Sequence, residues 1–180
     1  VVLPTAGDHN VYGGLYRDVE LIVTEQSVIR ASEGGIRLVQ KAVSSERAAV
    51  DAVIRIDGQR DRNLLVNLAV TTPRRDTIFF QASRFRVPAS GIGTVTIPIE
   101  LESPTLWNGV ENPYLYNVIV KVTDQNVTCD SLAVPLGLRY FSVDPKTGFA
   151  LNGRPLQLHG VFYYEDRASV GPALTEYQIR

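Results

Sequence analysis

Residues 138–166 read LRYFSVDPKTGFALNGRPLQLHGVFYYED, and the prediction of the fold starts from this stretch. From Phe149 it gives an apolar run, the pair Asn152-Gly153 and a second apolar run. Asn-Gly between apolar runs predicts a β-hairpin, because a type I′ turn needs φ above zero at both central residues. The second run leads into aromatic and acidic side chains, and loops at strand ends commonly carry binding sites.

Short segments with apolar side chains at every second position fill the chain ahead of this stretch. This period predicts half-buried strands, since successive side chains of a strand point to opposite faces. Turn residues separate the segments, and about seven such strands predict an all-β immunoglobulin-like β-sandwich. Seven of them are expected at residues 36–43, 50–56, 64–70, 78–81, 95–101, 114–122 and 129–135, and residues 15–23 predict a further strand ahead of them. Pro98 has no backbone donor and therefore predicts an edge strand for residues 95–101.

Composition and charge are those of an ordinary folded domain. Hydrophobic residues make up 44% and charged residues 21% of the chain, and the formal net charge is −1. Nucleic-acid binders usually carry a basic stripe, and a membrane span needs about 20 consecutive apolar residues. The sequence has neither pattern, so we expect neither nucleic acid nor a membrane as a partner.

The single cysteine, Cys129, excludes an internal disulfide and a cysteine-based zinc site. Its place in an expected strand predicts a small buried apolar side chain. His9 and His159 lie far apart in the sequence, and we expect no metal or other cofactor. The chain begins with Val1 and contains no methionine, from which we expect a piece of a longer protein.

Three motifs follow one another along the chain. Residues 13–19 read GGLYRDV, and residues 106–116 read LWNGVENPYLY. Gly137-Leu138-Arg139 is followed by FALNGRPLQLHGV at residues 149–161. In this order they resemble the signatures of glycoside hydrolase family 2, the family of β-galactosidases and β-glucuronidases. The second motif has one residue more before its glutamate than the family pattern.

The resemblance implies three parts. Residues 1–23 would end an N-terminal sugar-binding jelly roll, and residues 24–140 would form the immunoglobulin-like sandwich. Residues 141–180 would be a C-terminal extension, the first strand and loop of a (β/α)8 barrel, whose active site lies at the C-terminal ends of its strands.

The resemblance also implies a function for the longer protein. It would be a retaining β-glycosidase, β-galactosidase-like, whose two catalytic glutamates lie on later barrel strands beyond Arg180. No residue of this chain is therefore assigned a catalytic role, and we expect the chain alone to be inactive. The alternative is a stand-alone immunoglobulin-like module for carbohydrate binding or adhesion.

The candidate substrate-binding residues also come from the resemblance. The family carries a G-V-N-x-H-[EQ]-D run after the first barrel strand, and here a tyrosine stands at the histidine position. A tyrosine hydroxyl still forms hydrogen bonds with a sugar, but it cannot carry a positive charge. The candidates are Asp8, Tyr164, Glu165 and Asp166. Alternative roles are a turn aspartate for Asp8 and a structural pairing with Arg167 for the two acids of the loop.

The expected partner is a carbohydrate substrate, bound through the parent enzyme. A homo-oligomer is left open, because unpaired strand edges invite association. Trp107 lies in the loop of residues 104–113, where prolines at both ends prevent regular structure. We expect Trp107 to anchor this loop by packing, and stacking on a sugar is the alternative.

Overall fold

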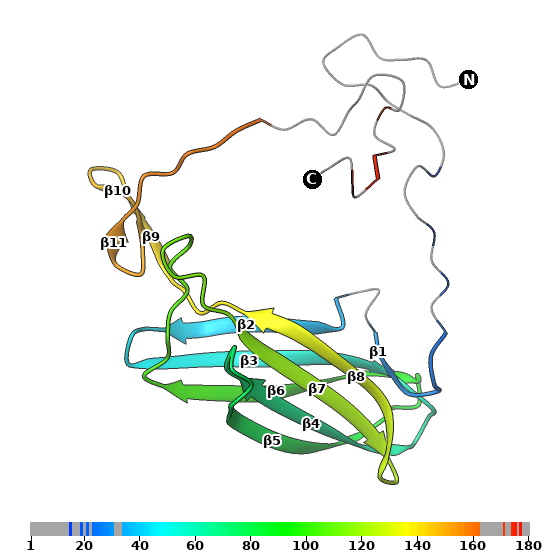
Figure 1. Ribbon diagram of the computed structural model, residues 1–180. Coiled ribbons are helices and arrows are strands. Elements are labelled where there is room, and N and C mark those ends of the chain that lie inside the picture. Colours follow the sequence, from blue (N-terminus) through cyan, green and yellow to red (C-terminus); the bar gives the residue numbers. More distant parts are fainter. Residues whose placement is uncertain are drawn as a thin grey trace. The chain divides into compact units, whose positions relative to one another are not determined.

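The structure is a computed structural model that describes residues 23–30 and 34–162, together with Leu15, Val19, Leu21, Gly171, Leu174, Thr175 and Tyr177. The chain divides into one compact unit, Thr24–Leu158, and a second made of Val1–Val23 and His159–Arg180. Strands β1 to β11 all belong to the first unit (Figure 1). The assignment of the flanking residues to a jelly roll and a barrel stays a prediction.

The first sheet is built around β3 (Arg47–Asp57). Strand β6 (Ile92–Glu102) runs antiparallel to β3 along its whole length, from Glu102 opposite Arg47 to Ile92 opposite Asp57. Strands β2 (Ile36–Val43) and β1 (Val28–Ile29) pair with β3 as well, one after the other along its length. Strand β6 thus lies at an edge, as predicted from the proline at position 98, which has no backbone donor.

The second sheet has the strand order β5-β4-β7-β8, with every pair antiparallel. Its strands are β5 (Thr77–Arg86), β4 (Asn63–Thr71), β7 (Tyr116–Asp124) and β8 (Val127–Leu136). Figure 1 shows the two sheets lying face to face. The all-β sandwich predicted from the sequence is confirmed.

Alternate residues of both sheets fill the space between them. Burial of this apolar surface stabilises the fold by roughly 25 cal/mol per Å². Twelve of the side chains shared between the central strands are less than 3% exposed: Val50, Ala52, Ile54 and Ile56 of β3, Leu64, Val66, Leu68 and Val70 of β4, Val118, Val120 and Val122 of β7, and Ile97 of β6.

A small third sheet follows the sandwich in the order β11-β10-β9. Its strands are β9 (Phe141–Asp144), β10 (Gly148–Leu151) and β11 (Arg154–Pro155). Between β10 and β11, Asn152 has φ 49° and Gly153 has φ 77°, so the predicted hairpin turn is confirmed.

Two predicted strands are wrong for the described residues. Leu15, Val19, Leu21 and Val23 alternate as a half-buried strand would, but they lie outside any strand and are 76–91% exposed. The apolar run after Asn152-Gly153 is paired only at Arg154–Pro155. A strand needs a partner for its backbone hydrogen bonds, and no described strand pairs with Leu15, Val19, Leu21 or Val23, or with the second run beyond Pro155.

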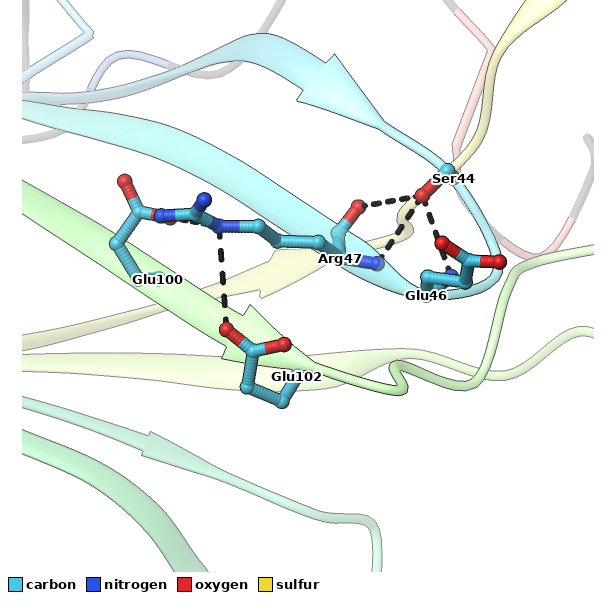
Figure 2. Close-up of polar contacts among 5 residues, drawn as sticks. All are labelled: Ser44, Glu46, Arg47, Glu100 and Glu102. Carbon is cyan, nitrogen blue, oxygen red and sulfur yellow. Dashed lines mark hydrogen bonds and ion pairs between the residues drawn. The ribbon is translucent and has the colours of Figure 1, made fainter.

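The outer face of the first sheet is charged, and several of its charges are paired. Figure 2 shows Arg47 between two carboxylates of β6, with its Nη2 2.9 Å from Oε2 of Glu100 and its Nε 3.9 Å from Oε1 of Glu102. The turn before it is closed by Ser44, whose Oγ accepts hydrogen bonds from the amides of Glu46 (3.2 Å) and Arg47 (3.0 Å). Exposed ion pairs of this kind contribute at most about 1 kcal/mol.

Candidate functional site

The structure describes two of the three sequence motifs but none of the predicted substrate-binding residues. Asp8, Tyr164, Glu165 and Asp166 all lie outside the described residues, as does most of the motif at residues 13–19. The other two motifs meet at the end of the sandwich where β6 and β8 finish. We call this the junction and define it as residues 104–115, 137–140 and 151–156 with Gln40.

The loop between β6 and β7 is tied down at several points. The Thr105 amide donates to the hydroxyl of Tyr116 (2.8 Å), and the Trp107 amide donates to the carbonyl of Leu138 (2.8 Å). The amide of Asn108 donates to the carbonyl of Asn112 (2.8 Å), which closes a small turn. A loop of irregular backbone is therefore held by directional contacts rather than by strand pairing.

Trp107 packs at the centre of the junction. A Cβ atom added at Gly137 would lie 3.4 Å from Cβ of Trp107 and 3.0 Å from Cδ2 of Leu115, so a glycine suits this close approach. The guanidinium carbon of Arg139 lies 4.9 Å from the centre of the Trp107 ring, within cation–π range. The predicted packing role of Trp107 is confirmed.

Asn152 braces the loop against the hairpin. Its Nδ2 donates to the carbonyl of Trp107 (3.0 Å) and to Oδ1 of Asn108 (2.6 Å). Its Oδ1 accepts from the amide of Tyr140 (3.0 Å). Asparagine tolerates the left-handed backbone of this turn and also supplies two donors and an acceptor. The sequence indicated the turn, but nothing in it revealed the partners across 44 and 45 residues.

Gln40 of β2 clamps the chain as it leaves the sandwich. Its Nε2 donates to the carbonyl of Gly137 (3.1 Å), and its Oε1 accepts from the amide of Arg139 (3.1 Å). Between these contacts, the side chain of Leu138 is completely buried. The direction in which the chain exits β8 is thus fixed by both sheets. Sequence reasoning missed Gln40, because a polar residue in a strand reads as solvent-facing.

Nearby tyrosines belong to the same end of the sandwich. The rings of Tyr114 and Tyr116 meet edge to face, with centroids 5.0 Å apart. Partial burial raises the pKa of Tyr114, and the phenol of Tyr116 raises it further. Tyr114 therefore stays a neutral hydroxyl at physiological pH.

A cleft of about 450 Å³ opens between the loop and the hairpin. The loop lines it with residues that include Val110, which is fully exposed, and Glu111. The hairpin lines it with Leu151, Arg154 and Leu156, among others. Retaining glycoside hydrolysis needs two carboxyl groups about 5–5.5 Å apart, and Glu111 is the one carboxylate in this lining. The cleft has the chemistry of a contact surface rather than of a hydrolytic site.

The described residues offer neither a metal site nor a membrane-spanning helix. Histidine, cysteine, aspartate and glutamate side chains there do not gather in any group of three or more that could hold a metal ion. In the same residues, no helix is both long enough and apolar enough to cross a membrane. Cys129 is free and half-buried, so it is less enclosed than predicted.

Comparison with known proteins gives the family. The sequence profile of "Glycosyl hydrolases family 2" matches residues 35–139, the region of the sandwich and of the second motif. The chain belongs to this family, as its motifs predicted.

Individual relatives extend the match over nearly the whole chain. A β-glucuronidase of Bacteroides fragilis is 35% identical over 176 residues, which are 96% of this chain and 25% of that protein. A β-galactosidase of Bacteroides ovatus is 27% identical over 170 residues, 92% of this chain and 19% of that protein. The chain thus spans a quarter or less of the length of these relatives.

A solved structure of β-glucuronidase 2 from Bacteroides uniformis has the same fold. It superposes with a TM-score of 0.84 at 25% identity, over 96% of this chain and 21% of that one. A structure from Bacteroides fragilis gives a TM-score of 0.87 at 30% identity, over 93% of this chain and 26% of that one. The sandwich and its junction are a shared part of larger family members.

Proposed function

We propose that this chain is the non-catalytic sandwich part of a retaining β-glycosidase, which hydrolyses O-glycosidic bonds in carbohydrate metabolism. The observation that carries the proposal is the asymmetry of the family match. It covers 96% of this chain but 25% of the β-glucuronidase relative. In such a parent enzyme the two catalytic carboxylates lie outside this chain.

Within the parent, the chain acts as a scaffold. Gln40, Trp107 and Asn152 fix the path of the backbone from the last strand of the sandwich into the hairpin. Catalysis is sensitive to small misplacements of the groups that position a substrate, so a rigid link between domains serves the chemistry. The cleft beside Val110 is where we place the contact with the following domain.

Two sugars are supported as the sugar that the parent enzyme would release from its substrate. The motifs resemble those of β-galactosidases, and the Bacteroides ovatus relative is named a β-galactosidase. The relative from Bacteroides fragilis at 35% identity is named a β-glucuronidase, which favours a β-glucuronide as the second candidate.

The substrate contacts of this chain are proposed from its motifs. Asp8, Tyr164, Glu165 and Asp166 would reach the sugar only within the parent. Tyr164 would offer a neutral hydroxyl where the family pattern has a histidine, so it would hydrogen-bond the sugar without adding a positive charge to the site.

The direct test compares the 180-residue chain with its full-length parent on aryl β-galactosides and aryl β-glucuronides. The parent should release the aryl group from one of them, and proton NMR should detect the β-anomer of the sugar first, as retention requires. The chain alone should release none above the buffer rate. Hydrolysis by the chain alone would overturn its non-catalytic role. A parent that hydrolyses neither but binds glycans would favour the stand-alone binding module.

A further inference from the structure

The outer face of the second sheet combines apolar side chains with basic ones. Cross-strand pairing places Phe80, Ala69, Ile119 and Ala133 in one row from β5 to β8. The next row holds Ala82, Asn67, Lys121 and Ser131, and the row after it holds Arg84, Leu65 and Thr123. An apolar row therefore borders polar and basic ones. Figure 1 shows the four strands that carry these rows, in the order β5-β4-β7-β8.

Three large apolar side chains of this face are exposed to solvent, while Ile119 between them and β8 is half-buried. Phe80 is 63% exposed, Ile78 is 44% exposed and Leu65 is 37% exposed. An aromatic ring presented on an open sheet, with apolar neighbours beside it, is a common sign of a contact surface. On the first sheet, by contrast, the outer face carries ion pairs such as that of Lys41 Nζ with Asp51 Oδ2 at 3.0 Å.

The charge on this face has a single sign. The outward positions of its four strands carry three ionisable side chains, and all are basic: Arg84, Arg86 and Lys121. Arg86 pairs with Asp61 at 3.0 Å. Among the described residues, Arg84 and Lys121 have no ion-pair partner. Their charges are thus available to an anionic ligand.

We propose that this face binds an anionic glycan, a polysaccharide whose sugars carry carboxylates. A pyranose ring would lie on the exposed ring of Phe80, since the flat apolar side of a sugar suits an aromatic face. Carboxylates would accept charge-assisted hydrogen bonds from Lys121 and Arg84, with the amide of Asn67 between them. Arg84 and Lys121 lie two strand spacings apart, roughly 10 Å, so a chain of sugars rather than one sugar spans them.

This inference rests on the proposed function and deepens it, because it names the class of glycan brought to the parent enzyme. It adds a binding surface on the sandwich that needs none of the predicted substrate residues. The ligand is chosen by charge complementarity, since an apolar surface with unpaired cations matches a carboxylated sugar polymer better than a neutral one.

Affinity electrophoresis of the 180-residue chain in native gels tests the proposal. Polygalacturonate, a carboxylated polysaccharide, should slow the chain, and neutral dextran should not. Phe80→Ala and Lys121→Gln should each raise the dissociation constant obtained from the retardation by about five- to tenfold. Lys41→Gln on the first sheet, and Phe141→Ala on β9, whose ring is 67% exposed, should leave it unchanged. Mobility in gels without polysaccharide corrects each variant for its charge, and thermal unfolding checks that it folds.

Several outcomes would overturn the proposal. One is the absence of retardation, and another is retardation that Phe80→Ala leaves intact. Retardation by dextran sulfate that is as strong as that by polygalacturonate, and is unchanged in Phe80→Ala, would show that the face binds polyanions in general. A dimer in light scattering that Phe80→Ala dissolves would show that a second copy covers the face. If the parent enzyme is active but the chain is not retarded, only the glycan-binding inference is contradicted. If the chain is retarded but the parent enzyme is inactive, only the hydrolase proposal is contradicted.

Discussion

Strand β4 and residues 15–23 have the same alternating sequence pattern, but the described apolar residues of the two differ in burial. Leu64, Val66, Leu68 and Val70 are no more than 2% exposed and lie between two neighbouring strands and beneath a second sheet. Leu21 and Val23 are 91% and 86% exposed and belong to no strand. An alternating sequence therefore gives a segment one apolar face. Whether that face is buried depends on a neighbouring strand and on a second sheet that packs against it.

The largest expected effect separates these two stretches directly. Leu68→Ala should lower the free energy of unfolding by about 2–5 kcal/mol, because it leaves a cavity among fully buried neighbours. Leu21→Ala, the same change at a 91% exposed position, should stay within about 0.5 kcal/mol. Urea unfolding followed by circular dichroism measures both. Equal losses for the two variants would mean that residues 15–23 belong to the core.

The second prediction compares two asparagines in left-handed turns. Asn152→Gly keeps a φ near 49° accessible and removes three side-chain hydrogen bonds. It should therefore lower the free energy of unfolding by about 1–3 kcal/mol. Asn126→Gly in the turn between β7 and β8, at φ 68°, should stay within about 0.5 kcal/mol.

Trp107 is the single tryptophan of the chain, so its fluorescence reports the junction locally. In urea, the fluorescence midpoint should fall for Asn152→Gly and remain in place for Asn126→Gly. An unchanged midpoint in both variants would argue against the brace.

Gln40 should matter somewhat less. Gln40→Ala removes the contacts with the backbone on both sides of Leu138, which should lower the free energy of unfolding by about 1–2 kcal/mol. Gln157→Ala, at an exposed position after the hairpin, is the matched control and should have no measurable effect. Urea midpoints for the pair would show whether the exit from β8 is held by the opposite sheet. The idea fails if the two variants unfold alike.

The smallest expected effect is one of pH, in the turn between β9 and β10. The amide of Thr147 and then that of Lys146 donate to Oδ1 of Asp144 at 2.8 Å each, with the Thr147 hydroxyl at 3.2 Å. These bonds lower the pKa of Asp144 from its ordinary value of 3.8. A lowered pKa means that the turn is fully supported above pH 3.8 and loses that support as the pH falls towards the folded-state value.

Carboxyl NMR shifts of Asp144 should therefore titrate with a midpoint below 3.8. Thr147→Ala removes the hydroxyl contact and keeps the amide, so it should move the midpoint part of the way back. A wild-type midpoint at or above 3.8 would contradict the hydrogen-bonded turn.

The fold was predictable from the sequence wherever the pattern and its partners lie in the same chain. The alternation of residues 50–56 and 64–70 identified β3 and β4, and Asn152-Gly153 identified the last hairpin. Pro98 placed β6 at an edge, since its missing donor fits no central strand. These signals are local, so they need no knowledge of distant residues.

The candidate site was harder, because its contacts join distant parts of the chain. Gln40 and Gly137 are 97 residues apart, and no local pattern marks a strand glutamine as a clamp. Trp107 was recognised as an anchor from its proline-bounded loop, but its partners Arg139 and Asn152 were not. The basic and aromatic face of the second sheet was also missed, since it emerges only when four strands are set in register.

Amide hydrogen exchange, measured on the 180-residue chain and on its full-length parent, tests the central claim most directly. In the chain, the amides of Val66 and Val120 should exchange slowly, and those of Leu21 and Val23 should exchange at nearly the unfolded rate. In the parent, Leu21 and Val23 should become protected, because we propose that the parent supplies the missing partner strands. Protection of Leu21 in the isolated chain, or its absence in the parent, would contradict the account.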